Sequence, residues 1–338
     1  MQFIRQLLLP FSWIYALVVW VRNGLYNKGV LQGEKGALPT VVIGNIHAGG
    51  TGKSPHTLKL ASLLEKEVRL AILSRGYGRK TSGFLLWKKG LTAADFGDEP
   101  LQYVNRLSET TVAVCEDRLA GIRQLKTQDA FQLVMLDDAF QHRKLIGDLN
   151  IVLMREAELP QDSRYLPTGN LRDHLSRLKD ADIVIITGVT SFWDEGQKEN
   201  FRKELPLSSD CLITSSTIRY GTPLNGQNNE IALPSKSILV TGIAHPQAFS
   251  DHVSSTTSVT HHFNYSDHYA FSPKDYSNWK NMLNKENGSA LITTEKDFMR
   301  INSSEFDADR LIYIPISIEI DDESAILERM KAVYSPKK

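Results

Sequence analysis

The sequence predicts an α/β fold in which a mostly parallel sheet carries helices on both faces. Short apolar, β-branched runs alternate with helical stretches along the first two thirds of the chain. These runs are continuously apolar, which is typical of parallel strands buried on both faces. A glycine-rich segment at 49–54 lies between the first strand and the first helix of this alternation. Together these observations predict a P-loop NTPase-like unit.

The composition is that of a globular chain with balanced charge. The 338 residues are 41% hydrophobic and 23% charged, and Lys plus Arg equals Asp plus Glu at 39 each. A chain without basic excess lacks the electrostatic footprint of nucleic-acid binding, so we expect no nucleic-acid partner. Cys115 and Cys211 have no CxxC spacing, which indicates buried thiols in a reducing compartment.

The first 28 residues form an apolar segment that precedes the main unit. No residue between Arg5 and Arg22 is charged, and nearly every residue over 11–21 is apolar. As a helix, 6–21 would span about 24 Å, which is less than the roughly 30 Å hydrocarbon core of a bilayer. Two interpretations stay open at this point: a helix lying in a membrane interface, or a helix buried between protein layers.

The elements that follow define three further regions: a nucleotide-binding unit over 29–210, a β-ribbon linker over 211–236, and a smaller α/β domain over 237–338. In the first, we expect strands at 40–46, 69–73, 112–115, 133–136, 150–153 and 182–187, and helices at 53–65, 99–107, 117–125 and 191–206. The ribbon is expected to pair 212–220 with 230–234 across a Gly- and Asn-rich turn. In the last region, strands are expected at 238–241, 290–293 and 311–314, with a helix near 246–252.

The glycine-rich segment carries the strongest chemical signal. It consists of Gly49, Gly50, Thr51, Gly52, Lys53 and Ser54. In a loop of this kind, backbone N–H groups and a helix N-terminus face the phosphates of a nucleotide. Lys53 adds a positive charge and the Ser54 hydroxyl is a Mg²⁺ ligand. The segment therefore predicts a nucleotide triphosphate with Mg²⁺, although His47 stands where the usual pattern has glycine.

Carboxylates follow two other elements of the same unit. Asp137 and Asp138 end the strand at 133–136, at the sheet edge where open α/β proteins bind ligands. Beside a P-loop, such a carboxylate holds Mg²⁺ directly or through water. Asp98 and Glu99 open a helix, where they either complement the helix dipole or serve a hydroxyl-directed kinase as base and metal-site residue.

Three further segments carry charged or aromatic side chains. The SRGYGRK segment at 74–80 presents Arg75 and Tyr77 to an anionic or sugar substrate, or forms a surface turn. Asp267 and His268 lie in a loop between tyrosines, and TTEKD at 293–297 follows a strand. Because no HExxH helix and no cysteine partner is present, we do not expect histidine metal ligands.

The order of these motifs resembles the tetraacyldisaccharide 4′-kinases of lipid A biosynthesis. The resemblance runs along most of the chain, through GGTGKSP at 49–55, SRGYGRK at 74–80, FGDEP at 96–100, Arg118, DDAFQH at 137–142, LPTGNLRD at 166–173, VTGIAHPQAF at 240–249, SDHYAFS at 266–272 and TTEKD at 293–297. Several motifs in one order are more specific than a P-loop alone. Two positions depart from the family pattern: Ala139 replaces a glycine and Asp173 replaces a glutamate.

The resemblance implies transfer of the γ-phosphate of ATP to the 4′-hydroxyl of an acylated glucosamine disaccharide 1-phosphate, giving lipid IVA. It places the enzyme peripherally at the cytoplasmic face of the bacterial inner membrane, which favours the membrane interpretation of 1–28, and it implies no obligate protein partner. Asp98 would be the base, paired with His268 across the cleft, while Lys53 and the loop amides hold ATP. The residues implied to form or support the Mg²⁺ site are Ser54, Glu99, Asp137, Asp138 and Gln141. Those implied to line the acceptor or phosphate side are Arg75, Tyr77, Arg118, His142, Arg172 and Asp173.

Two other functions fit part of the sequence. A membrane-docked P-loop ATPase or GTPase switch would use the same loop and the same N-terminal segment. The TEKD sequence is faintly similar to a guanine-selective NKxD motif, but Lys296 and Asp297 are adjacent here. A non-enzymatic nucleotide-binding scaffold would leave GDEP and the Asp267–His268 pair without a role.

Overall fold

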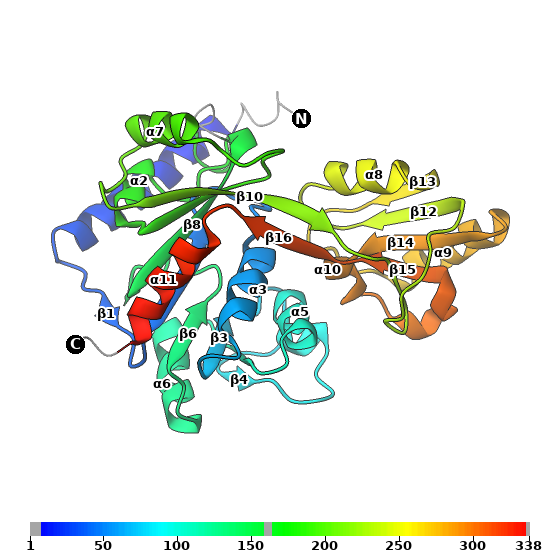
Figure 1. The fold of residues 1–338 in the computed structure, drawn as a ribbon, viewed down its shortest axis with the longest axis horizontal. Coiled ribbons are helices and arrows are strands. Elements are labelled where there is room, and N and C mark those ends of the chain that lie inside the picture. Colours follow the sequence, from blue (N-terminus) through cyan, green and yellow to red (C-terminus); the bar gives the residue numbers. More distant parts are fainter. Residues whose placement is uncertain (1–7, 159–163, 336–338) are drawn as a thin grey trace.

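The computed structural model describes residues 8–158 and 164–335, which form two sheets joined by a long ribbon (Figure 1). The larger sheet has nine strands in the order β16-β10-β9-β8-β2-β6-β3-β5-β4. These strands are β2 (Thr40–Asn45), β3 (Leu70–Ser74), β4 (Leu85–Leu86), β5 (Thr111–Val114), β6 (Leu133–Leu136), β8 (Leu149–Arg155), β9 (Ile183–Thr187), β10 (Leu212–Tyr220) and β16 (Ile316–Ile320). All neighbours are parallel except β4 with β5 and β16 with β10. The predicted large, mostly parallel sheet is confirmed.

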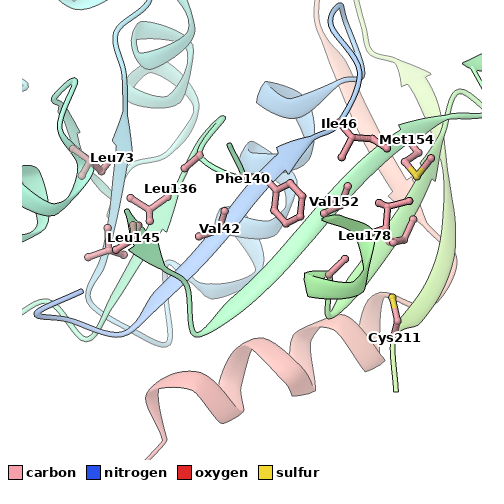
Figure 2. Packing of buried hydrophobic residues seen from close by; sticks show 14 of the residues in the cluster. Val42, Ile46, Leu73, Leu136, Phe140, Leu145, Val152, Met154, Leu178 and Cys211 are labelled. Atoms are coloured by element: carbon pink, nitrogen blue, oxygen red, sulfur yellow. The ribbon is translucent and has the colours of Figure 1, made fainter. Parts of the chain in front are cut away.

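Helices cover both faces of this sheet, and we call the sheet with its helices the large unit. One face packs against α3 (Lys53–Leu64), α5 (Asp98–Arg106) and α11 (Glu323–Tyr334). The other face packs against α6 (Arg118–Gln128), η2 (Leu175–Asp180) and α7 (Glu195–Glu204). Figure 2 shows the second core, where the Phe140 ring lies beside Val152 of β8. Because β2, β3, β6 and β9 are buried at every residue, their sequences read as continuous apolar runs.

A smaller sheet forms the small unit, with the order β11-β15-β14-β12-β13. Its elements are β11 (Leu224–Asn225), β12 (Lys236–Thr241), α8 (Gln247–Ser254), β13 (Ser258–Asn264), α9 (Pro273–Lys285), β14 (Ser289–Thr294), α10 (Glu295–Phe298) and β15 (Leu311–Ile314). Of these, β11, β13, α9 and α10 were not expected. The sequence around α9 did carry a signal, since Ser272 and Asp275 form a capping box just before an N-terminal proline.

Short elements complete the described chain. They are β1 (Glu34–Lys35), which pairs with β7 (Leu145–Ile146), α4 (Ala93–Phe96), η1 (Glu156–Glu158), η3 (Ser303–Glu305) and η4 (Ala308–Arg310).

The ribbon between the units differs from the expected one over 211–236. β10 pairs antiparallel with β16, from Ser216 opposite Ile320 to Tyr220 opposite Ile316, and 230–234 forms no strand. After β16 the chain re-enters the large unit, so 316–334 packs there rather than with the small unit, where the expected range 237–338 placed it. Because β10 and β16 lie far apart in the sequence, no short turn joins them and the sequence carries no hairpin signal for their pairing. The local pattern therefore predicted the wrong partner for β10.

Helix α2 (Leu9–Asn27) presents its polar residues to the protein and its apolar residues outward. Ser12 donates to Thr168 Oγ1 over 2.6 Å, and Asn23 donates to the Asp173 carboxylate over 2.7 Å. The large apolar side chains exposed on the helix are Leu9, Phe11, Trp13, Ile14, Leu17, Val18, Trp20, Val21 and Leu25. The helix is therefore not buried between protein layers. Within the described residues, no helix is long and apolar enough to cross a bilayer.

Replacing Ile326 with alanine should destabilise the large unit. Ile326 lies on α11 with 0% of its surface exposed, in the core beneath the large sheet. Truncating such a side chain leaves a cavity, so we expect a loss of about 2–5 kcal/mol in the free energy of unfolding measured in urea. Glu328→Ala, an exposed position on the same helix, is the control. Equal stability of the two variants would contradict the packing of α11 described above.

Candidate active site

A cleft of about 690 Å³ lies between the carboxyl edge of the large sheet and the small unit. The large unit contributes the glycine-rich loop, the segment after β3, and the carboxylates after β6. The small unit contributes 243–249, 267–268 and 294–296. The ribbon closes one side with Ile218, Ile316 and Ile318. The cleft therefore needs both units and the ribbon between them.

The glycine-rich loop connects β2 to α3, as its sequence predicts. Gly49 and Gly52 have φ values of 114° and 84°, which are accessible to glycine and strained for other residues. Asn45 at the end of β2 donates to Thr51 Oγ1 over 2.9 Å and fixes the middle of the loop. Gly52 offers no side-chain cap to α3, so the first N–H groups of this helix remain available to an anion.

Asp137 is fully buried at the end of β6. One carboxylate oxygen accepts a hydrogen bond from Tyr103 Oη over 2.8 Å, and the other has no hydrogen-bond partner among the described residues. Burial, followed by the nearby charges of Glu99 and Asp138, raises the pKa of Asp137 to about 7. A cation bound beside Asp137 would therefore stabilise the charged form of its carboxylate.

Asp138 lies in a different environment from its neighbour. Its carboxylate accepts from Arg172 over 3.1 Å and lies 3.6 Å from the Lys53 ammonium. Although burial opposes ionisation, the charges of Lys53 and Arg172 hold the pKa of Asp138 below its ordinary value. Asp138 adopts a φ of 48°, whereas Ala139 is not among the residues with positive φ. Replacing the family's glycine by Ala139 therefore costs no backbone strain.

The oxygen ligands around the loop fit Mg²⁺. Ser54, Glu99, Asp137 and Asp138 all line the cleft, and the second Asp137 oxygen is buried without a partner. Within the described ranges, no group of three His, Cys, Asp or Glu side chains could hold a metal by itself. Mg²⁺ commonly takes one or two carboxylates and completes its shell with substrate phosphates and water, so this partial ligand set suits it.

Asp98 and His268 come from different units and meet in the structure. His268 Nδ1 lies 2.9 Å from Asp98 Oδ2, and the other Asp98 oxygen accepts from the backbone N–H of Glu99. Burial raises the pKa of Asp98, but the hydrogen bond from His268 and the charges of Lys296, His268 and Arg300 outweigh it. The pKa of Asp98 is therefore lowered. The pairing that the resemblance implied is present.

Lys296 extends this pair and was not among the expected site residues. Its ammonium lies 3.1 Å from His268 Nε2 and 3.2 Å from Glu99 Oε1. Because an ammonium only donates, Nε2 accepts, and the imidazole proton lies on Nδ1 facing Asp98. The surrounding carboxylates, Glu99 first, outweigh burial and raise the pKa of Lys296. The TTEKD motif was the available signal for this residue.

A second set of contacts fixes α5 to the small unit. Gln102 Nε2 donates to Glu295 over 2.9 Å, and Arg106 donates to the same carboxylate over 3.1 Å. Gly97, at the start of α5, has a φ of 97° and packs closely on Gly76 of the RGYG segment. These contacts hold Asp98 and Glu99 against the residues that reach them from the small unit.

The expected acceptor residues separate into two groups. Arg75, Tyr77 and Arg172 line the cleft, and the Tyr77 ring lies 5.0 Å from the His268 ring. Arg118, His142 and Asp173 do not line it, and neither does Gln141, which was expected to form or support the metal site.

These four residues make supporting contacts instead. The buried Arg118 guanidinium donates to the carbonyls of Cys115 and Asp137. Gln141 donates to the Asn45 carbonyl, and His142 is partly buried, with a pKa lowered first by burial. Asp173 is buried beneath α2, where it accepts from Asn23 and lies 3.5 Å from Arg22.

Comparisons with known proteins identify relatives along nearly the whole chain. A family model described as tetraacyldisaccharide-1-P 4′-kinase matches residues 4–335. The tetraacyldisaccharide 4′-kinase of Flavobacterium johnsoniae is 36% identical, over 94% of this chain and 93% of the relative. The corresponding protein of Porphyromonas gingivalis is 33% identical over 99% of both chains. A crystal structure of LpxK from Aquifex aeolicus in complex with ATP superposes with a TM-score of 0.76 and 27% identity, covering 98% of this chain and 100% of that one.

Neutralising Asp137 and neutralising Asp138 should change the melting temperature in opposite directions. Since folding raises the pKa of Asp137 from 3.8 to about 7, the folded state binds this proton more tightly, and stability falls as the pH rises between these values. Asp137→Asn should therefore melt at a higher temperature than the parent at pH 8 in chelator, by an amount that shrinks towards pH 5. Asp138, whose pKa is lowered, is the matched control: Asp138→Asn should melt lower than the parent at pH 8. Shifts of the same sign in both variants would refute this account.

Proposed function

The chain belongs to the tetraacyldisaccharide 4′-kinase family, which makes it a kinase of lipid A biosynthesis, and from this premise we propose how its cleft performs the reaction. The substrate is tetraacyldisaccharide 1-phosphate, and the product carries the γ-phosphate of ATP on its 4′-hydroxyl. Asp98 is the general base, and His268 and Lys296 position it. The observation that carries this proposal is the contact of the buried Asp98 with His268, which lines the same cleft as the P-loop.

The glycine-rich loop holds the triphosphate of ATP. Its N–H groups and Lys53 face the phosphates. The apolar wall formed by Ile218, Ile316 and Ile318 receives the adenine ring of the nucleotide. Ser54, Asp137, Asp138 and Glu99 would hold Mg²⁺, which would neutralise charge on the phosphates. The relative from Aquifex aeolicus was crystallised with ATP, which supports this assignment of the nucleotide.

Asp98 takes the proton of the acceptor hydroxyl. Its lowered pKa keeps the carboxylate ionised at neutral pH, and the His268 N–H fixes the orientation of one oxygen. Phosphoryl transfer requires mainly positioning and charge stabilisation, so a fixed carboxylate, Lys53 and a metal ion suffice. Arg75 and Tyr77 lie on the side of the cleft from which an anionic sugar would approach.

A membrane-docked ATPase or GTPase switch accounts for less of the structure. Lys296, the lysine of the NKxD-like sequence, contacts His268 and Glu99. Asp297 is buried and accepts from the Gly242 N–H over 2.9 Å. Both side chains are thus engaged in holding the small unit and the Asp98 pair, which a kinase uses and a guanine-selective switch does not.

We also propose that α2 anchors the enzyme peripherally to the cytoplasmic face of the inner membrane. The helix exposes a continuous apolar surface that includes Trp13 and Trp20, while its polar side is fixed to the large unit through Ser12 and Asn23. Apolar surface of this extent, with tryptophans, is typical of helices that lie in a membrane interface. An acylated substrate resides in the same interface.

Removing the Asp98 carboxylate should abolish phosphoryl transfer while sparing ATP binding. With labelled ATP, Mg²⁺ and detergent-dispersed tetraacyldisaccharide 1-phosphate, we expect Asp98→Ala to lower kcat by about 10²- to 10⁴-fold, with the KM for ATP nearly unchanged. Asp129→Asn, at an exposed position on the far end of α6, is the control. If the parent enzyme released the label as free phosphate instead of transferring it to the lipid substrate, the switch would be favoured. An unchanged kcat in Asp98→Ala would eliminate Asp98 as the general base.

Charges on the exposed side of α2 should release the protein from membranes. Trp13 and Leu17 are 69% and 58% exposed, so Trp13→Glu with Leu17→Glu should leave the fold intact. We expect the partition coefficient onto anionic phospholipid vesicles, measured by sedimentation, to fall by about tenfold or more. The reason is that each large apolar side chain contributes about 1.5–3 kcal/mol when buried. Phe192→Glu, at an exposed position outside α2, is the matched control. Retention of the double variant on vesicles would place the membrane contact elsewhere.

A further inference from the structure

His56 links the glycine-rich loop to the ribbon, and the mechanism above does not use it. It lies in the first turn of α3 and is 1% exposed. One ring nitrogen, Nδ1, lies 2.7 Å from the Gly52 carbonyl oxygen, and the other, Nε2, lies 2.8 Å from Ser216 Oγ. Both polar atoms of a completely buried side chain are therefore engaged, each with a different part of the active site.

The hydrogen-bonding partners fix the state of the ring. A carbonyl oxygen only accepts, so Nδ1 carries the proton and donates it to Gly52. Nε2 then accepts from the Ser216 hydroxyl. Burial keeps the ring neutral, because it lowers the pKa of His56 to about 4 despite the opposing effect of the Gly52 hydrogen bond.

The contact with Gly52 orients the catalytic part of the loop. The Gly52 carbonyl and the Lys53 N–H belong to one planar trans peptide, so they point in opposite directions. Holding the carbonyl towards His56 turns the Lys53 N–H away from His56 and towards the phosphate side of the loop. The φ of 84° at Gly52 is a conformation that needs such support from its surroundings.

The contact with Ser216 reaches the start of the ribbon. Ser216 belongs to the last residue pair of β10 with β9 and to the first residue pair of β10 with β16. Beyond this point β10 no longer pairs with β9, and its pairing with β16 continues towards the small unit (Figure 1). A side chain that is hydrogen-bonded to Ser216, as His56 is, therefore contacts the ribbon at the point where the ribbon's direction towards the small unit is set.

We propose that His56 is a positioning residue that couples the phosphate loop to the ribbon, so that nucleotide held in the loop orients the small unit and His268 with it. This inference rests on the proposed binding of ATP by the loop. It predicts that the two hydrogen bonds of His56 have separable effects: the Gly52 bond supports nucleotide affinity, and the Ser216 bond transmits occupancy to the ribbon.

Amide variants separate the two bonds. In His56→Asn, the amide nitrogen occupies the place of Nδ1 and can still donate to Gly52, but the link to Ser216 is lost. In His56→Gln, the longer amide reaches Ser216 and loses Gly52. Ser216→Ala removes the second bond from the other side with little change in volume, and the double variant His56→Asn with Ser216→Ala completes a cycle.

Two measurements on the full chain test the coupling. The first is the Kd for ATP with Mg²⁺ by calorimetry. The second is the distance between nitroxide labels at Lys126→Cys on α6 and Lys285→Cys on α9, measured with and without a non-hydrolysable ATP analogue. Both label positions are exposed, whereas Cys115 and Cys211 are buried.

We expect ATP to narrow the distance distribution in the parent. His56→Asn and Ser216→Ala should keep Kd within about twofold but lose this narrowing and lower kcat, and the double variant should add nothing further. His56→Gln should weaken Kd by about tenfold, the effect of losing one buried hydrogen bond. Narrowing that persists in Ser216→Ala and His56→Asn, or that is absent from an ATP-binding parent, overturns the coupling and leaves the proposed function intact. A parent that binds no ATP overturns the proposed function, and the coupling with it.

Discussion

The hydrogen bond between Asp98 and His268 joins two separately folded units, and the cleft exists only while those units stay together. Other contacts also hold the two units together. Glu295 accepts hydrogen bonds from Gln102 and Arg106, and Lys296 donates to Glu99. None of these groups is far from the proposed base. The interactions that assemble the enzyme and those that orient its reactive carboxylate are therefore largely the same, so assembly and catalytic competence depend on one set of contacts.

The second constraint is electrostatic. Glu99, Asp137 and Asp138 lie together in a largely buried region, and burial without compensation would neutralise them. Compensation is uneven: Lys53 and Arg172 stabilise the charge of Asp138, whereas Asp137 is left with a raised pKa and a bare oxygen. The Asp137 carboxylate is therefore the group in this region that a bound cation would stabilise most in its charged form.

Local sequence predicted most of the large unit and much of the site. Strands such as β2 and β9 are apolar along their whole length, and the loop before Lys53 has a pattern that requires glycine, so both were evident without long-range information. What local sequence could not provide depends on distant pairing. The partner of β10 follows the entire small unit, and Asp173 looks like an acceptor contact until α2 is seen to cover it. His56 carries no motif, because its role arises from Ser216 on another element.

The position of α11 has a consequence for how the protein is made. Ile326 and Met330 complete a core most of whose other members were synthesised far earlier, and β16 supplies one wall of the cleft. Domains generally fold in order as they leave the ribosome, but here the earlier unit lacks β16 and α11 until 316–334 have been synthesised. The small unit has its own core and can fold first. A nascent chain that lacks 316–334 therefore has no finished cleft between the two units.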